Sequence, residues 1–220
     1  MIITEITRQN KNPDRYNIFI DGQFAFAING TDLLYHKLAV GTEIRHDLYE
    51  KLQDELDYAK ARDVAVRYLA HRPRSTKEVQ GKLVAGQYSE ASIQRVLKLL
   101  TDGGYLDDVN FAALFIQQKS SLANYGKRRI ITELFQKGVA KEDIMAAYGR
   151  AFAEDGTEAE TEQAAATRAI EKKLRNKDAQ AILNDQKELA RLTAFLARRG
   201  FSFGVIKTAI NEQQARLDGH

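Results

Sequence analysis

Hydrophobic and polar positions alternate within the first thirty residues, and this alternation predicts β-strands. One run places Tyr16, Ile18 and Ile20 on a single face, and the next does the same with Phe24, Phe26 and Ile28. Asp21-Gly22 separates the two runs, and this pair favours a type I′ turn, in which both central residues have positive φ. Because a hairpin alone is marginal in water, residues 2–7 are predicted to add a third strand. We expect a small antiparallel sheet that folds as a module of its own.

The pattern changes to a helical period after the sheet. Thr31 is predicted to cap a short helix over residues 32–38, which Gly41 ends. From Asp47 onward the apolar positions recur at four-residue spacing, as in Leu48, Leu52 and Leu56. Acidic residues crowd the interval from Glu43 to Asp57. They are interpreted as a solvated helix face.

Three later segments repeat one pattern. In each, a Leu precedes an Ile by ten residues, in the pairs Leu83–Ile93, Leu134–Ile144 and Leu196–Ile206. An apolar residue lies four positions before each Leu. Gly138 and Gly200 lie four positions after it, where a helix end favours left-handed backbone, and Gln87 takes this position in the first copy. Ser89 and Ser202 are predicted N-caps of the next helix, with Ala140 in the second copy. The segments are therefore predicted to be structural repeats.

A further amphipathic helix precedes each segment, over residues 59–70, 108–122 and 161–175, so each repeat has three helices. Capping boxes at Ser75–Glu78 and Thr157–Glu160 mark joints, and Asp102-Gly103-Gly104 ends the first repeat. The predicted fold is mainly α, with three tandem three-helix repeats in an elongated, curved array and a small N-terminal antiparallel β module. The predicted domains are 1–57 for the β module with its short helix, then 58–106, 107–152 and 157–216 for the repeats. The polar segment 176–186 is predicted to be a loose joint.

Composition excludes several classes of protein. Hydrophobic residues make up 44% and charged residues 29%, which is an ordinary balance for a globular chain. No apolar run approaches the roughly 18 residues of a membrane span, and the N-terminus does not resemble a secretory signal. The chain has no cysteine, which excludes disulfides and thiolate chemistry. We expect a cytoplasmic protein.

Catalytic and metal-binding patterns are missing from the sequence. No two of the four histidines have the i, i+4 spacing of a zinc-binding helix, and no glycine-rich phosphate loop is present. Asp107-Asp108 has two interpretations. The pair could hold a metal ion in a nuclease, or it could cap a helix and place an acid in the first turn, which needs no function. We favour the capping interpretation, and we expect no catalytic residue, metal or cofactor.

Basic residues form the strongest functional signal. A cluster surrounds the second helix of each predicted repeat, although the net charge is only +3. If the repeats stack as a solenoid, the clusters would form a continuous positive strip; the alternative is scattered, solvated charge. Aromatic residues nearby, among them Tyr125 and Phe115, are interpreted mainly as core packing. The candidate binding residues are Arg72, Arg74, Lys77, Lys82, Lys127, Arg128, Arg129, Lys137, Arg191, Arg198 and Arg199.

Several linked motifs resemble the RecX family of regulatory proteins. They are Tyr68-Leu-Ala-His-Arg-Pro-Arg-Ser-Thr-Lys-Glu78, Gly104-Tyr-Leu-Asp-Asp108, Tyr125-Gly-Lys-Arg-Arg-Ile130 and Lys137-Gly138-Val139. The resemblance covers residues 59–150 most strongly, and the departures are Gln87 at the glycine position and residues 155–163. It implies tandem three-helix repeats, no enzymatic activity, and binding to the RecA recombinase filament, whose strand exchange and ATP hydrolysis it would inhibit.

The sequence therefore predicts a monomeric, non-enzymatic regulator that binds the RecA filament, with single- or double-stranded DNA as a further ligand. Two alternative functions stay open. One is a helical nucleic-acid-binding module with no RecA target, against which the modest net charge argues. The other is a nuclease that uses Asp107 and Asp108.

Overall fold

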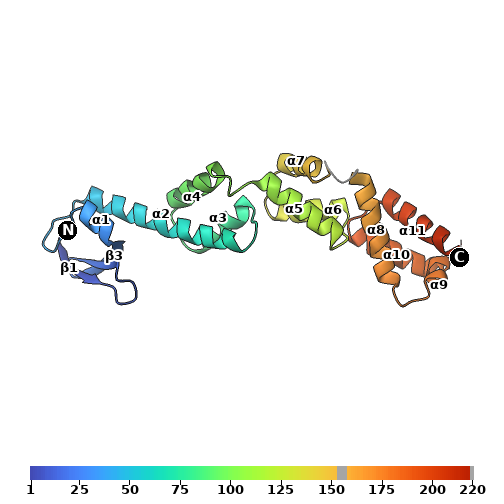
Figure 1. Ribbon diagram of the computed structural model, residues 1–220, viewed down its shortest axis with the longest axis horizontal. Helices are drawn as coiled ribbons and strands as arrows, with labels where there is room; N and C mark the ends of the chain where they lie inside the picture. The colour runs from blue at the N-terminus through green and yellow to red at the C-terminus, as the bar shows by residue number, and fades with distance from the viewer. Residues whose placement is uncertain (153–157, 219–220) are drawn as a thin grey trace. The chain divides into compact units, whose positions relative to one another are not determined.

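A computed structural model describes residues 1–152 and 158–218. It has a three-stranded antiparallel sheet followed by helices (Figure 1). The strands are β1 (Ile3–Arg8), β2 (Arg15–Ile20) and β3 (Gln23–Asn29). The helices are α1 (Gly30–Tyr35), α2 (His46–His71), α3 (Thr76–Ala85), α4 (Glu90–Asp102), α5 (Asp108–Ser121), α6 (Lys127–Gln136), α7 (Lys141–Ala151), α8 (Glu158–Leu174), α9 (Ala179–Asn184), α10 (Gln186–Arg198) and α11 (Phe203–Asp218). The chain divides into two compact units, Met1–His71 with Gln80–Leu100, and Arg72–Val79 with Thr101–His220.

The hairpin turn forms as predicted, because Asp21 and Gly22 both have positive φ, at 49° and 81°. The strand register contains a shift that the alternation did not reveal. Phe19 pairs with Phe24 and Ile18 pairs with Phe26, which leaves Ala25 as an extra residue in β3. This bulge brings Phe26 and Ile28 to the core face beside Ile18. The prediction was wrong for Phe24, which precedes the bulge and is 59% exposed.

The sheet shares its core with α2. Ile3, Ile18, Phe26 and Ile28 are buried in one cluster with Leu52, from the first half of that helix. The core of the sheet therefore extends past residue 30 to Leu52 and stays within the predicted domain 1–57. Independent folding of this module stays a prediction. The helix runs unbroken for 26 residues and buries Ala61 and Ala65 farther along, so the proposed domain limit between residues 57 and 58 falls inside it.

The short helix before α2 also differs from its prediction. Asn29 is the N-cap of α1, since its side chain accepts the N–H of Asp32, and Thr31 lies inside the helix. The helix ends at Tyr35, and Lys37 follows it with left-handed backbone (φ 51°). Gly41 also has positive φ (85°), but it lies farther along the chain than the helix end.

The repeat pattern agrees with the structure at its main positions. Leu83, Leu134 and Leu196 are each fully buried, as predicted. Gln87, Gly138 and Gly200 all have left-handed backbone, with φ of 59°, 78° and 90°. The first copy therefore keeps the helix-ending conformation without glycine.

Two core clusters lie in the second unit, one for each repeat. Ile116, Ile130 and Leu134 belong to the cluster formed by α5, α6 and α7. Ile170 and Leu196 belong to the other, which also takes Leu183 from α9. The segment 176–186 thus contains a packed helical turn rather than only a loose joint.

The predicted caps are largely present. The Ser75 N–H donates to Glu78 Oε2 at 3.1 Å, and the Glu78 N–H donates to Ser75 Oγ at 3.2 Å, which completes a capping box. Ser89 and Ser202 accept N–H groups of their helices, and Ala140 stands as an N-cap without a side-chain bond. Thr157 of the second capping box lies outside the described residues.

Candidate functional site

The eleven candidate basic residues differ in their exposure. Six have exposed side chains, and five are partly buried. The exposed residues are Arg72, Lys77, Lys82, Arg128, Arg191 and Arg198. The partly buried residues are Arg74, Lys127, Arg129, Lys137 and Arg199. The first group is the more accessible to a partner, and the second keeps part of its surface in contact with solvent.

Three of these cations form ion pairs with the Glu78 carboxylate. Its carboxylate lies 3.0 Å from Arg72, 3.2 Å from Lys137 Nζ and 3.9 Å from Arg74, whose side chain is only 14% exposed. Partial burial raises the pKa of Glu78, but hydrogen bonds from the Ser75 N–H, Arg72 and Lys137 outweigh it and hold the pKa below its ordinary value. Arg74 and Lys137 are therefore structural members of the cluster.

Glu133 is the centre of a second cluster. Arg129 Nε donates to Glu133 at 3.0 Å, and Lys119 Nζ lies 3.1 Å away. Burial raises the pKa of Glu133, and these two bonds more than reverse the effect, so the pKa lies below its ordinary value. The Arg129 guanidinium also lies 3.8 Å above the centre of the Tyr125 ring, which Arg199 approaches at 5.6 Å.

The junction between the second and third repeats explains much of the partial burial of the basic residues near it. The Gly126 N–H donates to the Arg199 carbonyl at 2.9 Å, and the Lys127 N–H donates to Glu162 Oε1 at 3.0 Å. The Arg199 side chain in turn donates to the Ala123 carbonyl at 2.6 Å. The first N–H groups of α6 are thus satisfied by groups of the third repeat.

The same arrangement occurs one repeat earlier. The Ser75 hydroxyl donates to the Lys137 carbonyl at 2.6 Å, and the Thr76 N–H donates to Asp108 Oδ1 at 2.9 Å. Asp108 therefore corresponds to Glu162, and Lys137 corresponds to Arg199. Lys127 and Lys137 thus contribute backbone groups to these junctions, and Arg199 contributes its backbone and its side chain. Their place in a binding strip stays a prediction.

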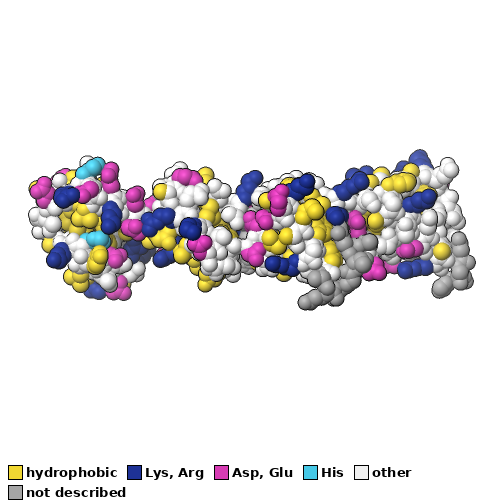
Figure 2. Space-filling view, turned by 90° about the horizontal axis from the view of Figure 1, so that it is seen from above, with side chains coloured by type: hydrophobic (Ala, Val, Ile, Leu, Met, Phe, Trp, Pro, Cys, Tyr) yellow, Lys and Arg dark blue, Asp and Glu magenta, His cyan; other side chains and the backbone are white. Residues whose placement is uncertain are grey.

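Exposed cations without a carboxylate partner remain on the middle helix of every repeat. Among residues 1–152 and 158–218, the side chains of Lys77 on α3, Arg128 on α6 and Arg198 on α10 form no ion pair or hydrogen bond. Figure 2 shows exposed Lys and Arg side chains interspersed with Asp and Glu on the face that it draws. The continuous strip stays a prediction.

Most aromatic rings near the cations are covered, although Phe135 on α6 is 47% exposed. Lys119 and Lys137 lie 5.0 and 5.7 Å from the centre of the Phe115 ring, and Phe201 is buried. Lys82 lies 6.0 Å from the centre of the Tyr68 ring. These rings pack against cations or the core, which agrees with their interpretation as packing residues.

The structure adds two basic residues that the sequence analysis missed. Lys173, near the end of α8, and Lys177, in the following turn, line one pocket with Arg191 and Arg198. The signal was present in the run Lys172-Lys173-Leu174-Arg175-Asn176-Lys177. This run spans the end of the helix predicted over residues 161–175 and the start of the loose joint predicted over residues 176–186.

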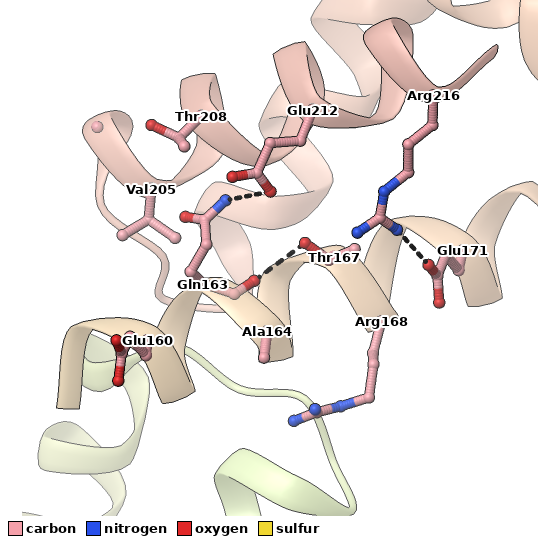
Figure 3. Close-up of a pocket in the computed structure, with 11 residues that line it drawn as sticks. Glu160, Gln163, Ala164, Thr167, Arg168, Glu171, Val205, Thr208, Glu212 and Arg216 are labelled. Atoms are coloured by element: carbon pink, nitrogen blue, oxygen red, sulfur yellow. Dashed lines mark hydrogen bonds and ion pairs between the residues drawn. The ribbon is translucent and has the colours of Figure 1, made fainter. Parts of the chain in front are cut away.

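A groove of about 750 Å³ between α8 and α11 is a less suitable binding site (Figure 3). Its charged groups are paired across it: Arg216 lies 3.3 Å from Glu171, and Gln163 donates to Glu212 at 3.1 Å. Arg168 points away from α11, and its Nε donates to Asn124 Oδ1 at 3.0 Å. The groove therefore does not extend the basic surface.

Asp107 and Asp108 both have structural roles. Asp107 caps α5 by accepting the Asn110 N–H at 2.8 Å, as predicted. Asp108 accepts the Thr76 N–H at the repeat junction. The part of the chain that the structure describes contains no cluster of three or more His, Cys, Asp or Glu suited to a metal ion. No helix among these residues is long and apolar enough to cross a membrane.

Four family models match successive parts of the chain. The Regulatory protein RecX N-terminal domain matches residues 1–45. The first, second and third three-helix domains of RecX match residues 61–100, 107–147 and 160–210.

Similar proteins cover nearly the whole chain. Regulatory protein RecX of Lacticaseibacillus paracasei is 35% identical over 94% of this chain and 82% of its own length. Regulatory protein RecX of Listeria monocytogenes is 30% identical over 99% of this chain and 78% of its own. A crystal structure of regulatory protein RecX shares the fold with a TM-score of 0.65 and 24% identity, over 94% of this chain and 98% of that one.

Proposed function

Because this chain belongs to the RecX family of regulatory proteins, we propose that it binds the RecA nucleoprotein filament and inhibits strand exchange and ATP hydrolysis. It would act in DNA repair and recombination, without chemistry of its own. The RecA filament is assigned here from the family resemblance, and the surface that meets it is assigned from the distribution of charge.

The observation that supports this surface is the exposed, unpaired cation on each middle helix. Lys77 and Arg128 both lie in the first turn of their helices. A positive charge there opposes the helix dipole and destabilises the helix slightly. Each side chain therefore has a local cost and no compensating ion pair among the described residues. A partner that supplies negative charge would explain both positions.

A nucleoprotein filament offers that charge as DNA phosphates and protein carboxylates. Contacts between cations and phosphates release counterions, so binding weakens as salt rises. A regulator that occupies such a surface can oppose the filament's movements or growth without a catalytic centre. The repeated middle helices would present equivalent cations along a repeated partner.

The test is RecA ATPase activity on single-stranded DNA, titrated with this protein. The double variant Lys77→Glu, Arg128→Glu should raise the concentration for half inhibition by roughly tenfold or more, since each reversal removes a charged contact and adds repulsion. The control Lys141→Glu, Lys207→Glu makes the same change in net charge at exposed residues elsewhere. Its inhibition should match that of the unaltered chain. Equal inhibition by all three proteins would refute the charge-based account.

A second candidate is a nucleic-acid-binding module with no RecA target. The basic pocket that includes Lys173 and Lys177 favours it. Affinity for RecA-coated DNA against bare DNA, at physiological salt, separates the two. Tighter binding to the coated DNA supports the filament, and equal binding supports the module.

A further inference from the structure

We propose that the pocket formed by the end of α8, the following turn and α10 binds backbone phosphates of a nucleic acid, without reading its bases. The pocket has a volume of about 200 Å³. Lys173 and Lys177 reach it from α8 and the turn, and Arg191 and Arg198 reach it from α10. All four side chains belong to exposed residues.

The charge of this pocket is strongly unbalanced. Four cations line it, and Glu188 is the one acidic residue among them. Glu188 is already held by an ion pair with Arg191. In the described ranges Lys177 and Arg198 have no ion pair. The excess of three positive charges equals the net charge of the entire 220-residue chain, so the pocket is a local concentration of positive charge.

The walls of the pocket argue against a ligand held by apolar contacts. Leu174 and Leu192 line it but are only 6% and 3% exposed. They offer little surface to an apolar side chain of a peptide, and the other apolar lining residues, Ile182 and Phe195, are half-buried. A ligand would therefore be held mainly by charge and hydrogen bonds, which suits a phosphate group.

The walls also argue against recognition of bases. Phe195 is the aromatic residue of the pocket, and Lys173 Nζ lies 5.2 Å from its ring centre. The Arg199 guanidinium lies 4.9 Å from the same ring. The two cations and the partial burial of Phe195 leave less of the ring for a base to stack on. Phosphate contacts carry no sequence information, so the binding should be independent of sequence.

This inference deepens the proposed function, because it rests on the same basic surface and assigns one part of it to nucleic acid. Its test uses bare DNA without recombinase. A chain that binds DNA through this pocket but fails to inhibit RecA would support the inference and refute the proposed function. A chain that inhibits RecA but binds no bare DNA would do the reverse.

The probe is a short fluorescein-labelled oligothymidylate, titrated by fluorescence anisotropy over a series of salt concentrations. The double variant Lys177→Gln, Arg198→Gln should lose roughly tenfold in affinity at low salt. Its salt slope should fall by about 0.7 log unit for each lost contact. The control Lys141→Gln, Lys207→Gln makes the same change in net charge outside the pocket and should bind like the unaltered chain. Circular dichroism of each variant checks the fold.

Four results would overturn the inference. They are no binding of oligothymidylate by the unaltered chain, unchanged binding by the pocket variant, an equal loss in the control, and a strong preference for one base sequence. Competition by polyglutamate as strong as that by unlabelled oligothymidylate would assign the pocket to an acidic protein surface instead.

Discussion

The backbone of Gly126 lies against that of Gly200, so closely that a Cβ on Gly126 would come within 2.4 Å of the Gly200 carbonyl carbon. Two hydrogen bonds also join these segments. The Gly126 N–H donates to the Arg199 carbonyl, and the Arg128 N–H donates to the Gly200 carbonyl. The start of α6 and the end of α10 thus form one backbone contact. Its geometry depends on the absence of a side chain at Gly126.

The first prediction tests this contact. Gly126→Ala should destabilise the second unit by about 1–3 kcal/mol, because the added methyl group meets backbone that cannot move cheaply. The φ of Gly126 is –79°, which alanine adopts without strain, so the effect would be steric. Gly149→Ala is the matched control, since nothing lies within 4 Å of its added Cβ in α7, and it should stabilise by about 0.5–1 kcal/mol. Urea unfolding measures both, and equal midpoints would contradict the contact.

The second prediction concerns the buried leucines of the repeats. Leu134→Ala should cost about 2–5 kcal/mol, because Leu134 is fully buried in the core of the second repeat. Leu122→Ala removes the same atoms from a residue that is 75% exposed, and it should change the free energy of unfolding by less than about 0.5 kcal/mol. Thermal unfolding of both variants distinguishes core from surface.

The third prediction separates two adjacent arginines. Arg129→Gln should lower the free energy of unfolding by about 1–2 kcal/mol, since it removes the bond to Glu133 and the contact with Tyr125 from a partly exposed site. Arg128→Gln should stay within about 0.5 kcal/mol of the unaltered chain. Reversal of the whole basic run would therefore confuse folding with binding. If the two variants proved equally stable, Arg129 would not have the structural role assigned to it.

The fourth prediction is a pH dependence. The pKa values of Glu78 and Glu133 lie below the ordinary 4.5 in the folded chain. The folded state therefore binds fewer protons than the unfolded state as pH falls through this range, and stability decreases. The urea midpoint should be nearly constant from neutral pH to about pH 5 and then decrease through and below the ordinary glutamate value.

The variant Glu133→Gln tests the assignment. It should start less stable at neutral pH and lose less on acidification, because one of the two carboxylates is gone. Glu5→Gln, at an exposed position of β1, should keep the pH profile of the unaltered chain. A profile for Glu133→Gln parallel to the unaltered one would show that this cluster does not control acid stability.

The fifth prediction concerns the N-terminal sheet. Deletion of residues 1–44 should expose Leu52, which is 3% exposed in the sheet core, together with the half-buried Leu48 and Leu56. The first half of α2 should then unfold, because most helix stability comes from packing. Amide hydrogen exchange should increase over residues 46–57, whereas the amides of α5 to α7 should stay protected. Full protection of residues 46–57 would show that the helix needs no sheet.

Local patterns in the sequence were sufficient to predict much of the fold. The left-handed backbone at Gly138 and Gly200, and the burial of Leu134 and Leu196, follow from spacing within one helix. The bulge at Ala25 does not, since regular pairing across the Asp21-Gly22 turn is equally compatible with the turn itself. Which register wins depends on the core that Leu52 of α2 completes.

The candidate site depends even more on contacts that local sequence patterns do not determine. Lys127, Arg128 and Arg129 are consecutive cations, and helical spacing distinguishes only Arg129, which has Glu133 four residues after it and Tyr125 four residues before it. Arg129 is occupied because Glu133 and Tyr125 lie beside it, and the start of α6 is covered because Glu162 and Arg199 reach it from the third repeat. The partners of Arg129 could have been found from helical spacing, whereas the contacts from Glu162 and Arg199 are long-range and do not follow from local patterns.

The following repeat supplies the groups that cap the start of α3 and of α6. This arrangement imposes an order on folding during synthesis. The Thr76 N–H at the start of α3 needs Asp108, 32 residues downstream, and the Lys127 N–H at the start of α6 needs Glu162, 35 residues downstream. A ribosome that has released only two repeats therefore holds a chain whose α6 still begins with open N–H groups. The first and second repeats are each completed by the repeat that follows. A premature stop should therefore weaken the repeat before the break as well as remove the one after it.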